Sequence, residues 1–156
     1  SAASDVYKRQ SVGDSRTWLA SIINLLKSRA TVLPDFIEYG RPFLVDEVTY
    51  EPEAVKKRLL VVGLTDHVAA LREAYAALEE DRFDSSSLEG VLRSIADSRS
   101  IKAGVLIHAT RVAMTGTTVS PSLFEMVELM GRAKAISRLR ALEQFLAEQP
   151  PLDSLS

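Results

Sequence analysis

Hydrophobic side chains recur along this chain every three or four residues, in segments that short polar stretches separate. This spacing places apolar side chains on one face of an α-helix. The clearest stripe consists of Trp18, Leu19, Ile22, Ile23, Leu25 and Leu26. The pattern predicts an all-α protein with seven or eight helices in two packed subdomains. The helices are expected at about 18–29, 34–39, 51–58, 66–78, 87–95, 101–114, 121–130 and 132–149.

Local signals indicate where several of these helices begin and end. Gly116 follows an apolar helix at the position where a left-handed backbone is common, so we expect it to end that helix. Ser120 and Pro121 have the residue types of an N-cap and a first helical residue. Ser86 and Glu89 have the spacing of a capping box. These signals predict short connections between the helices.

The chain divides into four segments by composition. Residues 1–10 lack a starting methionine and contain DVYKRQ, which resembles translated sequencing adapter, so we expect this segment to be a disordered scar. An acidic connector with Pro52 separates a helical connecting subdomain, 11–50, from a second helical subdomain, 51–149. Residues 150–156 are expected to be a frayed tail that begins with two prolines.

Composition excludes several classes of site. The 156 residues contain no cysteine, so a disulfide scaffold, a thiolate metal site and a cysteine nucleophile are excluded. The two histidines, His67 and His108, lie far apart in sequence, which disfavours an imidazole zinc site, and we expect no metal site. No apolar run approaches the roughly 18 residues of a membrane span. No glycine-rich phosphate loop or recognisable catalytic motif is present, so the chain has the character of a binding module without catalytic residues.

The net charge of −2 argues at first against a nucleic-acid partner, but it conceals an uneven distribution. Residues 98–140 contain seven bases and two acids, whereas residues 71–97 contain three bases and seven acids. The basic segment is either a set of ordinary solvated helix faces or a local phosphate-binding surface, because phosphate binding requires local clustering and not a high overall charge.

Three stretches in the same order resemble the C-terminal anticodon-binding region of bacterial-type glutamyl-tRNA synthetases, which are class I enzymes. The most specific is VLIHATRVAMTGTTVSPSLFEMVELMG at 105–131, with the pattern R-x-A-x-T-G followed by S-P-x-L-F-E. The others are LLKSRATVLPDFIEYGRPFL at 25–44 and YEPEAVKK at 50–57. The resemblance covers about residues 15–148.

This resemblance implies a helical domain that binds the anticodon of tRNA(Glu), with tRNA(Gln) left open as a second substrate. Unstacked anticodon bases can be recognised on their edges by arginines, hydroxyls and backbone groups. The residues that it assigns to tRNA binding are Arg29, Arg111, Thr115, Gly116, Thr117, Thr118, Ser120, Pro121, Arg132 and Lys134. For Arg29 and Arg111, hydrogen bonding to the last carbonyls of helices is the alternative role.

The resemblance also bears on the longer enzyme. Such an enzyme uses ATP and Mg²⁺ to activate glutamate in a catalytic domain whose two nucleotide-binding signatures do not occur in these residues. We therefore expect no catalytic residue and no cofactor in this part, a cytoplasmic monomer, and neither DNA nor membrane as a partner. The alternative is a free-standing helical module that binds RNA or protein without catalysis.

Overall fold

The computed structural model describes residues 2–27 and 33–149, and the chain is all-α within them, which confirms the predicted class. Eight α-helices are present in this part, together with one π-helical and one 3₁₀ segment, and no strand. The elements are α1 (Ala2–Lys27), α2 (Leu33–Leu44), α3 (Pro52–Ala54), the π-helix η1 (Val55–Leu59), α4 (Leu64–Ala77), the 3₁₀-helix η2 (Glu80–Arg82), α5 (Ser85–Ser98), α6 (Ala103–Thr115), α7 (Leu123–Met130) and α8 (Arg132–Glu148).

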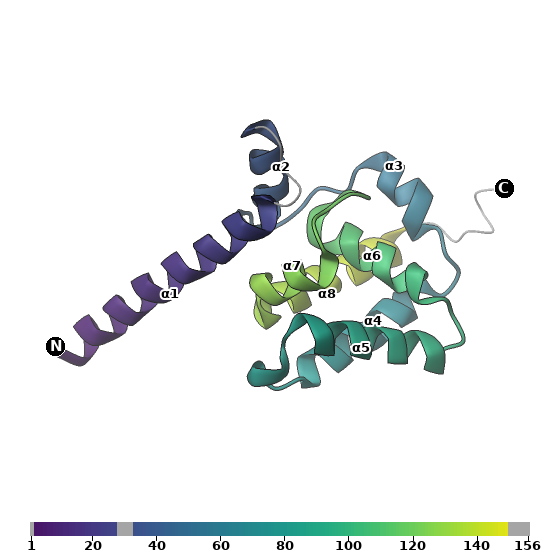
Figure 1. Ribbon diagram of the computed structural model, residues 1–156. Helices are drawn as coiled ribbons and strands as arrows, with labels where there is room; N and C mark the ends of the chain where they lie inside the picture. The colour runs from purple at the N-terminus through teal and green to yellow at the C-terminus, as the bar shows by residue number, and fades with distance from the viewer. Residues whose placement is uncertain (1, 28–32, 150–156) are drawn as a thin grey trace.

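Helices α4 to α8 pack into a bundle (Figure 1). Helix α4 lies along α8, while α5 contacts α4, α6 and α7. The side chains between these helices, such as Leu71, Leu92, Leu106 and Leu139, are fully buried. Burial of each such leucine stabilises the fold by about 1.5–3 kcal/mol before the entropy of ordering is counted. The helical spacing read in the sequence therefore corresponds to one shared core.

Helices α1 and α2 attach to this bundle through Trp18. Its indole N–H donates to the Leu129 carbonyl of α7, and its ring lies edge-on to Phe43 of α2 with centroids 6.5 Å apart. Figure 1 shows α1 extending away from the bundle beyond this anchor. The buried cluster includes Phe43 together with residues of α4 to α8, so one core spans the predicted subdomains. A functional division at residue 50 stays a prediction.

Two segments are more helical than the sequence suggested. Residues 2–10, which we expected to be disordered, form the first turns of α1. This stretch is rich in alanine and long polar residues and has no proline or glycine, so local propensity favours continuing the helix upstream. Helix α2 continues to Leu44, past the predicted end near residue 39, with Pro42 in its last turn.

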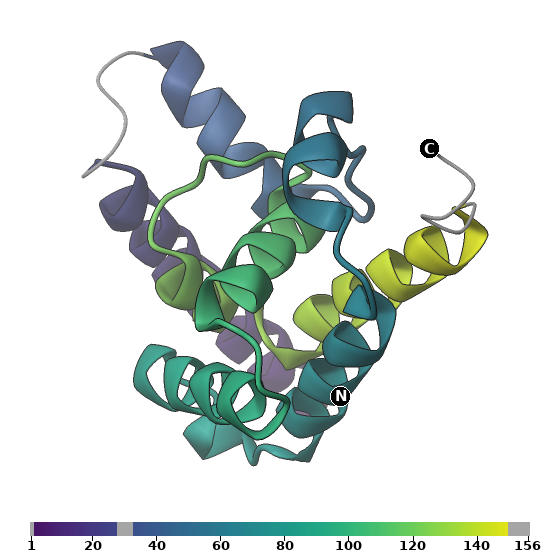
Figure 2. The same ribbon diagram turned by 90° about the vertical axis from the view of Figure 1, so that its right-hand side faces the viewer.

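Two predicted helix starts are wrong. Helix α5 begins at Ser85 because Asp84 caps it: the Asp84 carboxylate accepts a 2.8 Å hydrogen bond from the Ser87 N–H, and no Ser86 capping box forms. Helix α7 begins at Leu123, with Ser122 at the N-cap. Residues 120 and 121 instead belong to the loop before α7, which passes between α2 and α3 (Figure 2).

Candidate nucleic-acid interface

The loop between α6 and α7, residues 116–122, begins at a glycine whose conformation and surroundings leave no room for a side chain. Gly116 has a φ of +81° and ends α6 by donating to the Val112 carbonyl, as predicted. A Cβ at this position would lie 2.1 Å from the Thr49 carbonyl oxygen. The Glu51 N–H donates a 2.9 Å hydrogen bond to the Gly116 carbonyl. The loop is therefore packed, backbone against backbone, on the connector that leads into α3.

Threonine hydroxyls fix the shape of this loop. The Thr115 hydroxyl donates to the Arg111 carbonyl at 2.8 Å and accepts from the Thr117 N–H at 3.1 Å. The Thr117 hydroxyl donates to the Val119 carbonyl at 2.7 Å. No hydrogen bond of the Thr118 hydroxyl is found within the described part of the chain. Of the three threonines that the sequence offers to RNA, two are thus engaged inside the loop and Thr118 is available.

Arg111 crosses from α6 to the far end of the same loop. Its Nε donates to the Ser120 hydroxyl at 2.9 Å, and that hydroxyl donates to the Pro121 carbonyl at 2.8 Å. Its Nη1 lies 3.3 Å from Nδ1 of His108 on the preceding turn. Arg111 therefore faces the loop, as the sequence predicts. The same bonds explain why Ser120 does not cap α7.

His108 sits in an electropositive environment. Burial, followed by the positive charges of Arg58 and Arg111, lowers the pKa of His108 below its ordinary value of 6.5. Arg58 belongs to η1, which packs against α6, and its Nε is buried with no hydrogen-bond partner among the described residues. The imidazole is therefore neutral at pH 7. A bound anion nearby would raise its pKa again.

Other cations of the basic segment are used inside the protein. Arg138, which is 2% exposed, donates to the Met114 carbonyl near the end of α6 and to the Val45 carbonyl of the connector. Lys134 donates to the Phe43 carbonyl of α2 at 2.8 Å. Arg132 donates to the Leu78 carbonyl after α4 and lies 3.7 Å from Glu80. Helix α8 thus supplies hydrogen-bond donors to backbone carbonyls at four places, and this accounts for much of the local positive charge.

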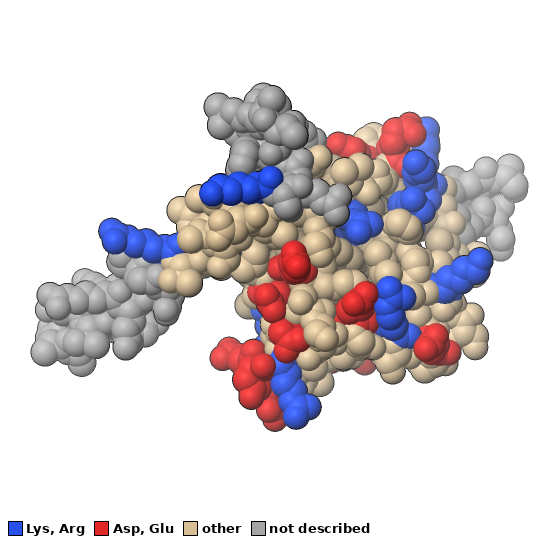
Figure 3. Space-filling model, viewed as in Figure 1, with Lys and Arg blue, Asp and Glu red and all other residues tan. Residues whose placement is uncertain are grey.

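Because several basic side chains are bonded to backbone carbonyls inside the protein, the surface shows no large basic patch on the face that is drawn (Figure 3). Figure 3 shows acidic and basic side chains interspersed over the visible face, with no continuous basic field. Lys102 and Arg140 are exposed, whereas Arg111, Arg132 and Lys134 are half-buried. Within residues 2–27 and 33–149, no group of acids and histidines could hold a metal ion, and no helix has the length and apolarity of a membrane span.

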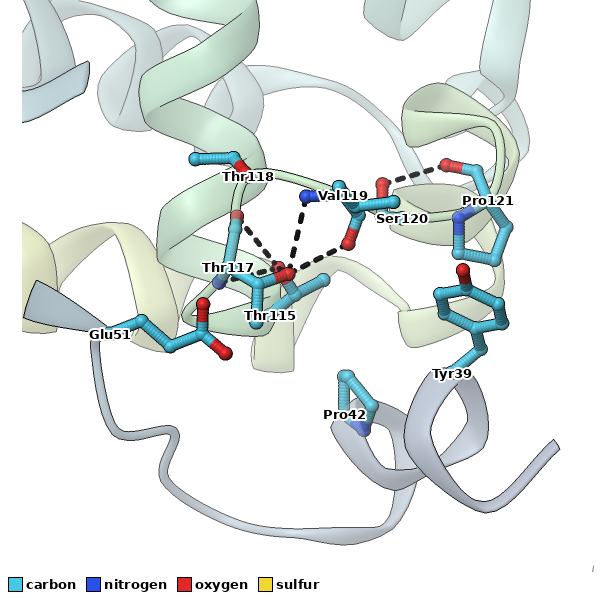
Figure 4. Close-up of a pocket in the computed structure, with 9 residues that line it drawn as sticks. All are labelled: Tyr39, Pro42, Glu51, Thr115, Thr117, Thr118, Val119, Ser120 and Pro121. Atoms are coloured by element: carbon cyan, nitrogen blue, oxygen red, sulfur yellow. Dashed lines mark hydrogen bonds between the residues drawn. The ribbon is translucent and has the colours of Figure 1, made fainter. Parts of the chain in front are cut away.

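A cavity of about 270 Å³ opens beside the loop (Figure 4). Its lining residues come from α2, the connector, the last residue of α6 and the loop: Tyr39, Pro42, Glu51, Thr115, Thr117, Thr118, Val119, Ser120 and Pro121. A neighbouring hollow of about 220 Å³ shares Pro42, Glu51, Thr115 and Thr117. The main cavity lies just below the range of roughly 300–1,000 Å³ typical of pockets for drug-sized ligands, so its size suits a single flat ring system.

The structure places the predicted binding residues in three groups. Thr115, Thr117, Thr118, Ser120 and Pro121 line the cavity, and Arg111 and Gly116 support it. Arg132 and Lys134 lie elsewhere with internal partners, so their assignment to RNA phosphates stays a prediction. Arg29 lies outside the described residues.

Sequence reasoning missed four cavity residues, namely Tyr39, Pro42, Glu51 and Val119, and one supporting residue, Arg138. In the sequence, Tyr39 belongs to a predicted helix, Pro42 ends or bends that helix, Glu51 is an acid of the connector, Val119 is an apolar residue of the loop and Arg138 is one charge of the basic segment. Arg138 is bonded to Val45, which is distant in sequence, so no short-range motif marks the contact. The 25–44 and 50–57 stretches of the resemblance were the available signal for the first three, because these residues lie within them.

Comparisons with known proteins agree with the predicted resemblance. A family model described as an anticodon binding domain matches residues 4–142. Glutamate–tRNA ligase 2 of Koribacter versatilis is 41% identical over 127 residues, which cover 81% of this chain and 26% of that protein. Glutamate–tRNA ligase of Syntrophobacter fumaroxidans is 36% identical over 135 residues, covering 86% of this chain and 28% of that protein. The chain thus spans about a quarter of the length of these relatives.

A solved structure shows the same fold. The crystal structure of a glutamate tRNA ligase from Elizabethkingia meningosepticum, in complex with its amino acid, matches with a TM-score of 0.72 at 23% identity. The match covers 80% of this chain and 24% of that one. The helical arrangement around the α6–α7 loop therefore occurs within a larger ligase. Since the family model covers most of its length, the chain belongs to the anticodon binding domain family.

Proposed function

We propose that this chain binds the anticodon loop of tRNA(Glu), and that it does so at the cavity beside the α6–α7 loop. The observation that carries the proposal is the coincidence of two features in one place. Residues of the most specific stretch of the resemblance, 105–131, also form one wall of a cavity of single-ring size, namely Thr115 and five residues of the loop that follows it.

The chemistry of the cavity supports a base as the ligand. Tyr39 provides an aromatic ring, and stacking of a base on such a ring contributes about 1–3 kcal/mol. Pro42, Val119 and Pro121 provide further apolar surface. The Thr118 hydroxyl and Glu51 provide polar groups for the base edges. Bases in an anticodon loop are unstacked, so they can enter such a site without first disrupting a helix.

The wider activity is proposed on the similarity to the relatives. The protein to which this domain belongs attaches glutamate to tRNA, using ATP and Mg²⁺ at a catalytic domain separate from the residues described here. The role of this domain is to select the tRNA. Whether tRNA(Gln) is also accepted depends on the bases that the cavity admits.

Equilibrium binding tests the proposal. Fluorescently labelled stem-loops with the tRNA(Glu) anticodon and with a scrambled loop on the same stem are titrated with the 156-residue chain at fixed salt, because phosphate contacts make affinity depend strongly on ionic strength. We expect tighter binding of the anticodon loop, and a loss of about 5- to 150-fold in Tyr39→Ala. Equal affinity for both loops would overturn the proposal and would favour a non-specific RNA- or protein-binding module.

A further inference from the structure

We infer that the Glu51 carboxylate selects, within this cavity, a nucleobase that presents an exocyclic amino group, and that it disfavours uracil. The inference rests on the proposed function and adds a specificity-determining residue to it. Glu51 borders both the main cavity and the neighbouring hollow. Among the described residues that line the main cavity, it is the only one with a charged side chain.

The backbone of Glu51 is fixed on both sides. Its N–H donates to the Gly116 carbonyl at 2.9 Å, and its carbonyl accepts from the Val55 N–H at 3.1 Å. Pro52, the first residue of α3, restricts the conformation of the residue before it. The Cβ of Glu51 is therefore held at a constant position relative to the α6–α7 loop, and the exposed carboxylate extends from that point.

The side chain itself is not used by the protein. Glu51 occupies the N-cap of α3, yet it makes no side-chain capping bond. No hydrogen bond or ion pair of its carboxylate is found among the described residues, although such acids usually find a partner at a helix start. In Figure 4 the carboxylate points toward Thr115 and Thr117, on the side of the loop that faces Pro42. The group is thus positioned and available.

The chemistry of an ionised carboxylate decides which base it accepts. It has acceptor oxygens and no proton to donate. Cytosine, adenine and guanine each carry an amino group that donates to such an acceptor, as in the carboxylate–cytosine pairing seen in nucleic-acid recognition. Uracil carries the O4 carbonyl oxygen in place of the cytosine amino group, and the carboxylate would repel that oxygen, which leaves N3–H as the one donor on this edge. An acid in a site for a polyanion costs affinity, and base discrimination is the gain that offsets this cost.

The test measures discrimination and not affinity alone. Anticodon stem-loops of tRNA(Glu) are prepared in which each base bearing an amino group is replaced in turn by its analogue without one: cytosine by uracil, adenine by purine and guanine by hypoxanthine. Each is titrated, at constant salt, with the unaltered chain, with Glu51→Gln and with Glu53→Gln. Glu53→Gln is the matched control because it removes the same charge from an exposed residue. Glu53 is not among the residues that line either cavity.

We expect one replacement to weaken binding to the unaltered chain and to Glu53→Gln by about 5- to 150-fold. That penalty should fall severalfold in Glu51→Gln, since an amide can turn to donate where the carboxylate cannot. If the penalty persists in Glu51→Gln, or if Glu51→Gln tightens binding of every loop equally, Glu51 is only a repulsive neighbour and the inference is wrong. If the unaltered chain binds no loop at all, the proposed function itself fails.

Discussion

Two turns of the bundle join successive helices in different ways: residues 78–84 between α4 and α5, and residues 116–122 between α6 and α7. In the first, Phe83 is buried edge-on to Tyr75 with ring centroids 6.2 Å apart, and the Tyr75 hydroxyl donates to the Leu88 carbonyl. Asp84 caps the following helix. In the second, a left-handed glycine and a chain of hydroxyl bonds replace the buried ring.

The difference lies in what each turn does with its surface. The α4–α5 turn fills its interior with apolar side chains and exposes acids, notably Glu79, Glu80 and Asp81. The α6–α7 turn is rigid, yet both cavities described above lie beside it. Polar bonding within a loop holds its shape without filling the adjacent space, so a ligand can be admitted. The first turn therefore joins two helices, whereas the second joins two helices and also borders the proposed binding cavity.

The largest expected effect is that of Gly116→Ala. A non-glycine residue with a positive φ is strained by about 1–2 kcal/mol, and the added Cβ would also collide with the Thr49 carbonyl. We expect a loss of about 4 kcal/mol or more in the free energy of unfolding, measured by urea denaturation.

Two further glycines separate the causes of this loss. Gly131 has a φ of +87° and a ψ of 159°, a conformation that is essentially restricted to glycine, and open space around its Cβ position, so Gly131→Ala should lose only strain energy, about 1–3 kcal/mol. Gly90 lies inside α5 with no atom near its Cβ position, and Gly90→Ala should stabilise by about 0.5–1 kcal/mol. A loss in Gly116→Ala of no more than about 1–2 kcal/mol, the value of left-handed strain alone, would show that the packing against Thr49 contributes nothing.

Arg111→Ala should produce the next largest effect, on RNA affinity. Removing the guanidinium takes away the donor to Ser120 and a positive charge beside the cavity. We expect about 10- to 100-fold weaker binding of the anticodon stem-loop, since hydrogen bonds to charged groups contribute about 1.5–3 kcal/mol. Arg93→Ala removes the same charge from the exposed face of α5, and it should leave the affinity nearly unchanged. Similar losses of affinity in both variants would mean that Arg111 contributes only its positive charge and not a specific position beside the cavity.

Asp84→Ala tests the other turn. Loss of the side-chain cap should cost about 1 kcal/mol of stability because the Ser87 N–H loses its partner. Thermal unfolding measures this loss, and the affinity for the stem-loop should stay the same. A change in RNA affinity as large as that of Arg111→Ala would contradict the division of roles between the two turns.

The smallest expected effect is a pH dependence at His108. Because its folded-state pKa is lowered, the unfolded chain binds the proton more readily, so its contribution to stability is present above about pH 6.5 and is lost as the pH falls through the lowered value. NMR titration should place its pKa below 6.5. Arg58→Gln should raise that pKa by removing a neighbouring positive charge; an unchanged pKa would mean that burial and Arg111 account for the lowering.

Much of this account could be predicted from the sequence, but only where the cause is local. The helices, the left-handed Gly116 and the orientation of Arg111 toward the loop follow from spacing along a single segment. The roles of Glu51 and Arg138 could not be predicted, because their backbone partners lie far away in the chain. The predicted start of α7 was wrong for a similar reason. The Ser120 hydroxyl accepts a hydrogen bond from Arg111, and Ser120 therefore lies in the loop and does not cap the helix.

The central claim is that RNA contacts the α6–α7 turn and not the α4–α5 turn. NMR titration of the ¹⁵N-labelled chain with the tRNA(Glu) anticodon stem-loop tests it most directly. We expect the amide signals of residues 115–120 and of Glu51 to shift in a saturable way, while those of residues 79–84 stay in place. Shifts confined to residues 79–84, or spread evenly over all exposed amides, would contradict the account.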